Sequence, residues 1–529
     1  MSTDDLPLSG LGDPSIAPRN VLVMPYNVNY WVYERLIPYM RGKYGTRFVV
    51  LVPEGRREEI AAHWCVEGDK VVTHQEMETI ADTDQAVDFE TKAAKACDFE
   101  ARYGTCYMRD IIQLDRSMST SFLSHAPWSP IAAMRSSDAS TMIGKINHLI
   151  EVSAKLFDEE RIDLALVWPL EALSASICAV AEGTGVPVSY PYVSSRKGLL
   201  HWSPSAYADD SQHRVAFEQM PESDPIPMSE VVPPDSVLKE IADMDRQHAL
   251  PRILTEIARK CFHWLEFKVL DIKKLGWRFY KVRRMSTARE IIQDLYKWWF
   301  YKKIGSMSER RIEAFEGRPF VYYGLALEPE FSIQARSKEF TDQSTVIRHI
   351  AMSLPAGYDL VIKEHVLLGR RPISYYRDLL KFPNIRMAHP SVRGVDLAAR
   401  AEAVATMASS VTLEAGLLGK PVMEFSKHTV FSFMPHVETV TSIHEMRDVL
   451  TRLLAPKTEK EITEIRRNAA RLLKAIEAIS FNGEGSPIFR QNDIRMDDDG
   501  IARMGELLVT LFRAKKAGLT EKYASFPST

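Results

Sequence analysis

Short apolar runs alternate with helix-like stretches in the first part of the chain. These runs lie at 20–24, 47–52, 163–168 and 186–190. They are rich in Val and Leu, as expected of strands buried on both faces of a parallel sheet. Helices are predicted at 30–41 and 172–183, and the polar stretch 58–94 is interpreted as mainly helical. The β-α-β alternation predicts a doubly wound α/β domain.

A second set of apolar runs begins at Pro319 and predicts a second domain of the same type. Its strands are predicted at 320–323, 359–363, 385–387, 403–406 and 421–425. Its helices are predicted at 344–352, 374–380, 394–400, 411–418, 443–454 and 460–478. Two such units favour an α/β enzyme with two Rossmann-type domains, whose ligand cleft lies where the carboxyl ends of both sets of strands face each other.

Changes in composition divide the chain into five parts. We predict a flexible arm over 1–18 and an N-terminal Rossmann-like domain over 19–200. Residues 204–234 are rich in Pro, Ser and Asp and predict a loop, while 236–311 has a helical, basic pattern. We therefore interpret 201–315 as a linker and basic helical connector. A C-terminal Rossmann-like domain is predicted over 316–480, and a helical tail that packs back over 481–529.

Composition and charge limit the kinds of partner. The chain has 529 residues, 45% hydrophobic and 26% charged, and a formal net charge of -3. This excludes a globally basic nucleic-acid binder, and no nucleic-acid partner is predicted. The five cysteines form no CxxC pair and no zinc-like spacing, so neither a disulfide framework nor a metal is predicted. The N-terminus does not resemble a signal peptide and no apolar run reaches about 18 residues, so we expect a cytoplasmic protein.

Two strand ends in the second domain carry charged residues suited to a nucleotide ligand. Glu330 follows the first strand, and its carboxylate can accept hydrogen bonds from sugar hydroxyls. Lys363 and His365 end the second strand, and Arg370 and Arg371 follow in the next loop. Such cations can neutralise phosphate charge, and arginine forks match phosphate oxygens. A solvated loop is the alternative explanation for each residue taken alone.

A third strand end, after 403–406, runs into small residues and then a helix. Ser409 and Ser410 are candidate caps of that helix, whose N–H groups form a candidate phosphate site. Glu414, one turn further on, is a candidate ligand of a ribose hydroxyl. An ordinary capped helix is the alternative. The chain contains no GxGxxG or Walker motif, which disfavours the standard NAD and ATP sites.

Acids of the N-terminal half are candidates for a catalytic base. Glu100 and Asp115 lie near predicted strand ends, and Arg116 follows Asp115 directly. A carboxylate here would suit deprotonation of an acceptor hydroxyl. A structural Asp–Arg pair is the alternative.

The stretch 268–303 interleaves lysines and arginines with Trp, Phe and Tyr. This profile is typical of a helix that touches anionic lipid or grips an acidic glycan. The alternative is a helical connector whose aromatic residues pack onto a domain.

Several of these motifs, in this order, resemble the capsule polysaccharide biosynthesis family, which includes bacterial Kdo transferases. The resemblance is carried by 319–323, 328–330, 363–365, 369–371, 375–377, 383–386, 401–404, 413–415 and 419–421, with a weaker match at Glu100, Tyr103, Asp115 and Arg116. Glu328 stands where the family has Gln, and Val366 where it has Pro.

The resemblance implies a GT-B fold, a cytoplasmic enzyme peripheral to the inner membrane, and a CMP-activated sugar as donor. It implies donor-site roles for Glu330, His365, Ser409, Ser410 and Glu414. On this basis we expect a glycosyltransferase that moves a sugar from a nucleotide-sugar to a bacterial surface or capsular glycan or glycolipid, without a metal or other cofactor.

Two other functions fit the same sequence. A nucleotide-sugar epimerase of the same fold would use a similar donor site. A non-catalytic glycan-binding or assembly subunit is suggested by the changes at Glu328 and Val366.

Overall fold

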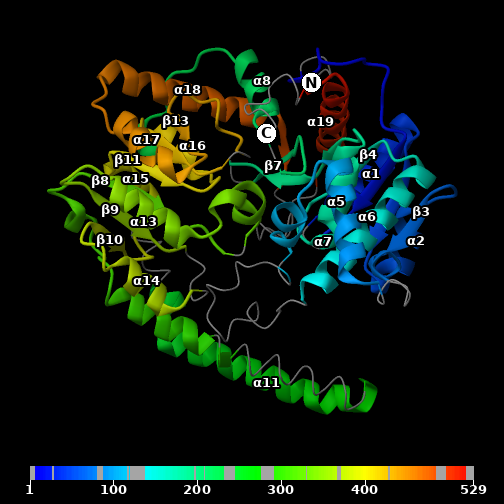
Figure 1. The fold of residues 1–529 in the computed structure, drawn as a ribbon, viewed down its shortest axis with the longest axis horizontal. Helices are drawn as coiled ribbons and strands as arrows, with labels where there is room; N and C mark the ends of the chain where they lie inside the picture. Colours follow the sequence, from blue (N-terminus) through cyan, green and yellow to red (C-terminus); the bar gives the residue numbers. More distant parts are fainter. Residues whose placement is uncertain are drawn as a thin grey trace.

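The computed structural model of the chain describes residues 6–26, 29–79, 87–115, 118, 138–195, 198–207, 209–231, 245–275, 291–292, 294–328, 330–365, 371–426, 429–483 and 496–519. Two parallel sheets form two lobes, and a long helix projects below them (Figure 1). The strand orders confirm the predicted α/β class with two doubly wound, Rossmann-type domains.

The N-terminal sheet is parallel, with the order β3-β2-β1-β4-β5. Its strands are β1 (Asn20–Met24), β2 (Arg47–Val52), β3 (Lys70–Thr73), β4 (Leu164–Val167) and β5 (Val188–Ser189). The helices around it are α1 (Tyr30–Tyr44), α2 (Arg57–Trp64), α3 (His74–Glu78), α5 (Phe89–Tyr103), α6 (Ala139–Glu160) and α7 (Ala172–Gly183), with a π-helix at Tyr107–Ile112. Alternate residues of β1 and β2 enter two separate cores, which explains their continuous apolar sequence.

The C-terminal sheet is also parallel, with the order β10-β9-β8-β11-β12-β13. Its strands are β8 (Phe320–Gly324), β9 (Asp359–Lys363), β10 (Ile385–Ala388), β11 (Ala403–Thr406), β12 (Val422–Glu424) and β13 (Val437–Thr439). Its helices are α13 (Gln343–Ser353), α14 (Ile373–Leu379), α15 (Gly394–Arg400), α16 (Val411–Leu417), α17 (Met446–Leu453) and α18 (Glu459–Ala478), with a π-helix at Ser332–Arg336. Residues of α13, α14 and α17 join one core, and those of α15, α16 and α18 join the other, so both faces are covered.

A small antiparallel sheet joins the end of the chain to the first domain. It has the order β14-β7-β6, with β6 (Pro191–Val193), β7 (Leu199–Trp202) and β14 (Ser480–Asn482). The last helix, α19 (Asp498–Lys516), packs on α1. There the Glu506 carboxylate accepts hydrogen bonds from Tyr39 at 2.6 Å, Tyr44 at 2.5 Å and Lys43 at 2.7 Å. The C-terminal segment therefore stabilises the N-terminal domain.

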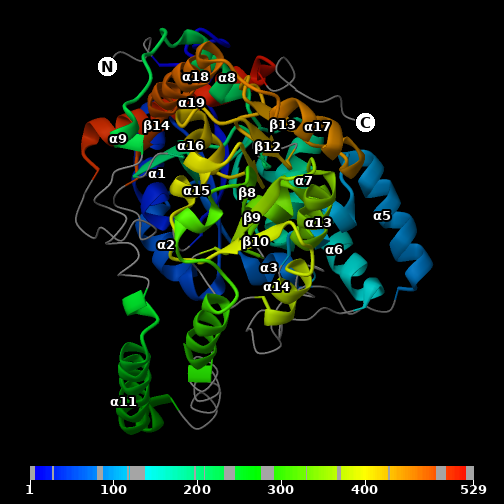
Figure 2. The ribbon, with the colours of Figure 1, turned by 90° about the vertical axis from the view of Figure 1, so that its left-hand side faces the viewer.

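The connector forms a helical arm. Its helix α11 (Leu250–Leu275) extends away from both lobes (Figure 2). A second helical segment, 294–305, returns to the C-terminal domain, where Phe300 and Tyr301 are buried in the core. These two aromatic residues therefore pack onto a domain, whereas Trp299 is 44% exposed. Residues 276–290 and 293 of the predicted interfacial stretch lie outside the described residues.

Several local expectations were wrong. The stretch 58–94 contains strand β3, an edge strand with only two apolar residues and hence little periodic signal. The predicted loop 204–234 contains α8 (Ser211–Gln219), whose buried face is largely polar and lacks an apolar period. The arm 1–18 is not loose over its described part, because Leu6 and Leu8 are buried in the N-terminal core.

Candidate active site

The carboxyl ends of the two sheets face each other. Trp168 directly follows β4, and Phe331 lies in the loop after β8. Their ring centroids are 5.7 Å apart. Phe331 also contacts Tyr190 and Tyr192, and it belongs to the core of the N-terminal domain rather than to that of its own domain. Ligands of doubly wound sheets bind at these strand ends, so this interface is the candidate site.

The segment after Phe331 holds the two domains together through polar contacts. Lys338 Nζ lies 2.7 Å from Asp110 Oδ1, and both side chains are buried. The same ammonium lies 3.5 Å from the ring centroid of Tyr207. Gln334 donates a hydrogen bond to the Gln113 carbonyl at 2.8 Å. The loop that was expected to touch a donor sugar therefore also forms a polar link between the domains.

Glu330, the acid predicted in this loop, lies at the start of the π-helix. Its carbonyl accepts hydrogen bonds from the N–H groups of Ile333 at 3.1 Å and Gln334 at 3.0 Å. The residue is half-buried. Its predicted donor-site role stays a prediction.

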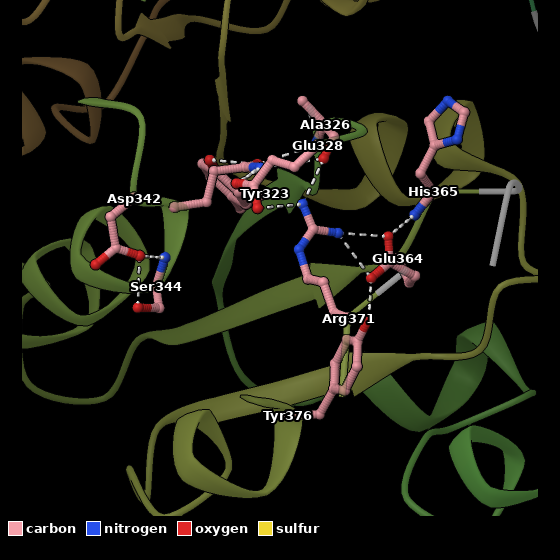
Figure 3. A network of polar contacts seen from close by, with 10 residues as sticks. Tyr323, Ala326, Glu328, Asp342, Ser344, Glu364, His365, Arg371 and Tyr376 are labelled. Atoms are coloured by element: carbon pink, nitrogen blue, oxygen red, sulfur yellow. Dashed lines mark hydrogen bonds and ion pairs between the residues drawn. The ribbon is translucent and has the colours of Figure 1, made fainter. Parts of the chain in front are cut away.

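Arg371 is the centre of a buried ion network (Figure 3). Its Nη1 lies 2.9 Å from both carboxylate oxygens of Glu364, and its Nη2 lies 3.4 Å from Glu328 and 2.7 Å from the Ala326 carbonyl. Tyr376 donates a hydrogen bond to Glu364. Burial works against the cation, but Glu328 and Glu364 more than offset it and raise the pKa of Arg371.

This network ties the loops after β8 and β9 to each other. The guanidinium of Arg371, only 2% exposed, neutralises two acids and is not free for a phosphate in this arrangement. Arg370, its predicted companion, lies outside the described residues.

Lys363 and His365 flank this network at the end of β9. The Lys363 side chain is 9% exposed. The His365 N–H donates a hydrogen bond to Glu364 at 2.6 Å, and its imidazole points away from Arg371 (Figure 3). The two side chains therefore stand at the strand edge, as predicted, and their role in donor binding stays a prediction.

The turn before α16 is tight. Ala408 adopts a φ of 39°, in the left-handed region. Ser409 Oγ accepts from the Val411 N–H at 3.3 Å, and the carbonyls of Ser409 and Ser410 accept from the next N–H groups of the helix. The free N–H groups expected here are therefore already bonded within the turn. Ser410 and Glu414 are exposed and remain available to a ligand.

The two predicted acids of the N-terminal domain cap backbone groups. Glu100, on α5, accepts a hydrogen bond from the Tyr107 N–H at 2.6 Å, so it sits on a helix rather than at a strand end. Asp115 is buried and accepts from the Ala172 N–H at 2.9 Å, at the start of α7. The first contact stabilises the turn between α5 and the π-helix, and the second stabilises the start of α7. Arg116 lies outside the described residues.

Three further polar residues were not singled out in the sequence. Glu171 follows β4, and burial together with the nearby Asp115 raises its pKa. His389, fully buried after β10, accepts the Ser391 N–H at Nδ1, and its Nε2 has no partner among the described residues. Arg336 ends the π-helix at the domain interface. Glu171 and His389 follow predicted strands, so a search for polar residues after strand ends would have found them. Nothing in the sequence marks Arg336.

No group of three or more His, Cys, Asp and Glu side chains in the described part of the chain is arranged to hold a metal ion. No helix in that part of the chain has the length and apolar character needed to cross a bilayer.

No protein-family model and no curated protein matches this sequence. Solved structures do match. The calicheamicin glycosyltransferase CalG4 has 11% identity over 93% of this chain and 99% of that chain, with a TM-score of 0.26. The UDP-GlcNAc 2-epimerase from Neisseria meningitidis, bound to UDP-GlcNAc, has 11% identity over 87% and 99%, with a TM-score of 0.24. The Thermosulfurimonas dismutans KpsC β-Kdo 2,4 transferase has 12% identity over 60% and 85%, with a TM-score of 0.28. At these TM-scores the likeness carries no argument about activity, and the fold assignment rests on strand order.

Proposed function

We propose that the protein is a glycosyltransferase that moves a sugar from a nucleotide-sugar to a glycan or glycolipid acceptor. The observation that carries this proposal is the meeting of two carboxyl sheet edges, with Phe331 of one domain packed on Trp168 of the other. This arrangement lets one domain hold a donor and the other an acceptor across a shared interface. The donor class favoured by the family resemblance is a CMP-sugar.

The C-terminal edge is the proposed donor side. Lys363 and His365 end β9, and Glu414 and Ser410 line the start of α16 on the other side of β8. A cation and an imidazole at this edge would stabilise the negative charge that develops on the departing phosphate. The exposed Ser410 and Glu414 would bind hydroxyls of the nucleotide.

The N-terminal edge is the proposed acceptor side. Glu171 is the best-placed base in the described residues, because it follows β4 and its raised pKa brings it nearer to neutrality. Asp115, which caps α7, holds a negative charge close to Glu171 and contributes to that rise. Asp115 would therefore act through Glu171 rather than on the acceptor itself.

Nucleotide binding tests the donor side. Isothermal titration with CMP, UDP and GDP is expected to show one bound nucleotide, with affinity at least about tenfold weaker in His365→Ala, the order of one lost charge-assisted contact. His444→Ala, an exposed histidine far along the chain, is the matched control and should bind normally. Equal affinity in wild type and His365→Ala would remove His365 from the site. No binding of any nucleotide would remove the proposed function.

The helical arm is proposed to contact an anionic membrane. Leu254 is 51% exposed, Phe262 66% and Trp299 44%. Exposed cations Arg259 and Lys297 lie on the same two helical segments. Apolar side chains flanked by cations, on a helix that projects from the body (Figure 2), suit the interface of an anionic bilayer.

Vesicle co-sedimentation tests the arm. Wild type should sediment with phosphatidylglycerol vesicles and not with pure phosphatidylcholine, and binding should weaken with salt. Replacing Leu254, Phe262 and Trp299 with Ser should abolish sedimentation without unfolding the protein. Equal sedimentation of this variant and wild type would contradict the membrane contact.

A further inference from the structure

Arg336 is a buried cation that forms no ion pair with the residues the structure describes. The side chain is 3% exposed. Its Nε and Nη2 atoms are buried and find no hydrogen-bond partner in the described part of the chain. Its guanidinium carbon lies 4.4 Å from the ring centroid of Tyr192, across the domain interface. Burying an unpaired guanidinium is costly, so its retention at this place calls for a partner.

Arg336, Tyr192 and two histidines, His201 and His213, form a buried cluster. The ring of His201, in β7, packs edge-on against two other rings. Its centroid lies 5.8 Å from that of Tyr192 and 5.0 Å from that of His213, in α8. The Nδ1 atom of each imidazole is buried without a partner in the part of the chain described here. Burial and the charge of Arg336 lower the pKa of His213 to about 3. The cluster is thus one fixed positive charge beside two neutral imidazoles.

The buried acid Glu424 is influenced by the charge of Arg336 but forms no ion pair with it. Glu424 ends β12, is fully buried, and accepts hydrogen bonds from Thr429 at 2.7 Å and Thr412 at 3.3 Å. Burial raises its pKa to about 7, and the partial compensation by Thr429, Thr412 and Arg336 does not reverse this. A carboxyl group that is half protonated near neutrality is a poor counter-ion.

We propose that Arg336, with His201 and His213, forms a subsite for an oxyanion of the substrate, a phosphate or a carboxylate. The Nε and Nη2 atoms form the guanidinium edge that binds two oxygens of such a group side by side. The guanidinium carbon lies 4.4 Å from the ring centroid of Tyr192 and 5.9 Å from that of Phe331, so an anion would reach the buried guanidinium only after these side chains move. The proposal rests on the proposed function in taking the anion to belong to the donor or the acceptor.

Calorimetric titration with inorganic phosphate and with glucuronate tests the subsite and separates its two ligand sources. Wild type should bind at least one of them, and Arg336→Met should bind it at least about tenfold more weakly. Arg336→Lys, which keeps the charge but not the fork, should fall between the two. Arg311→Gln, at an arginine whose side chain is 84% exposed, is the matched control and should bind like wild type.

Three outcomes decide between the subsite and the wider function. Anion binding by wild type that is equal in Arg336→Met, or absent altogether, overturns the subsite. CMP or UDP binding that persists alongside such a result leaves the proposed function standing. Anion binding that depends on Arg336, in a protein that binds no nucleotide, supports the subsite and removes the proposed function. If Arg336→Met does not fold, Arg336→Lys carries the comparison.

Discussion

Arg371 and Arg336 are both buried cations in loops that follow neighbouring strands of the C-terminal sheet, and their surroundings differ. Arg371 is 2% exposed and lies between the carboxylates of Glu364 and Glu328. Arg336 is 3% exposed and lies over the ring of Tyr192. The two arginines are equally buried, but only Arg371 has carboxylate partners among the described residues.

The difference follows from where each loop docks. The loop of Arg371 stays within its own domain, where β8 and β9 bring two acids beside it. The π-helix that ends in Arg336 leaves its domain and packs into the N-terminal core, which offers aromatic rings and neutral imidazoles. The acids that pair with Arg371 come from its own domain, whereas Arg336 lies at the domain interface, where Lys338 is paired with Asp110 of the other domain.

The largest expected effect comes from removing Arg371. Arg371→Met leaves Glu328 and Glu364 buried without a cation, and should lower the free energy of unfolding by about 3–5 kcal/mol. Arg336→Met, which removes an unpaired charge, should leave stability unchanged or raise it. Urea denaturation of both variants measures the contrast. Similar losses in the two would contradict the distinction between these arginines.

Glu424 offers a second test of the difference between the two arginines, because it is a buried acid whose pKa is influenced by the charge of Arg336. Its folded pKa of about 7 lies above its ordinary value of 4.5, so ionisation costs stability as pH rises from about 4.5 to about 7. Glu424→Gln should remove this cost, about 3 kcal/mol above pH 7. The difference in unfolding free energy between wild type and variant, measured from pH 4.5 to 8, checks the prediction. A difference that does not change with pH would make Glu424 an ionised partner of Arg336.

Lys338 is a third buried cation, paired across the domains with Asp110. Burial alone would raise the pKa of Asp110, but Lys338 and Arg109 lower it to about 2. The stability from this lowered pKa is present above about pH 4 and is lost as pH falls towards 2. It amounts to about 2 kcal/mol. Acid unfolding of Asp110→Asn should lack this component. If the unfolding free energies of wild type and variant fall equally between pH 4 and 2, the Lys338–Asp110 pair does not stabilise the interface.

The smallest effect is expected at an exposed pair. Arg452 lies 2.6 Å from Glu438, but both side chains are partly in water. Arg452→Gln should change the free energy of unfolding by less than about 0.5 kcal/mol. Urea denaturation at low and high salt measures this. A loss comparable to that in Arg371→Met would mean that distance, rather than burial, determines the value of these pairs.

The fold was largely predictable from the sequence, because buried parallel strands are continuous apolar runs. β9 (Asp359–Lys363) and β11 (Ala403–Thr406) were predicted with their observed bounds. The edge strand β3 and the polar helix α8 were missed because neither carries an apolar period. Their burial depends on neighbours that are distant in the chain.

The site was predictable only in part. The rule that ligands bind at strand ends placed Lys363, His365 and Ser410 at the carboxyl edge of the sheet, where the structure has them, and their binding roles stay predictions. The rule could not say which cation has a partner. Arg371 was chosen for its neighbouring arginine, yet it is paired with Glu364, whereas Arg336, on a π-helix that packs against the other domain, has no ion pair among the described residues.

Nucleotide release from a panel of CMP-, UDP- and GDP-sugars, with and without oligosaccharide acceptors, tests the proposed transferase most directly. The account predicts that one donor class releases its nucleotide in step with a glycosylated acceptor, and that release falls in His365→Ala. Release that needs no acceptor would indicate an epimerase instead. No release from any donor, by folded protein, would contradict a catalytic function.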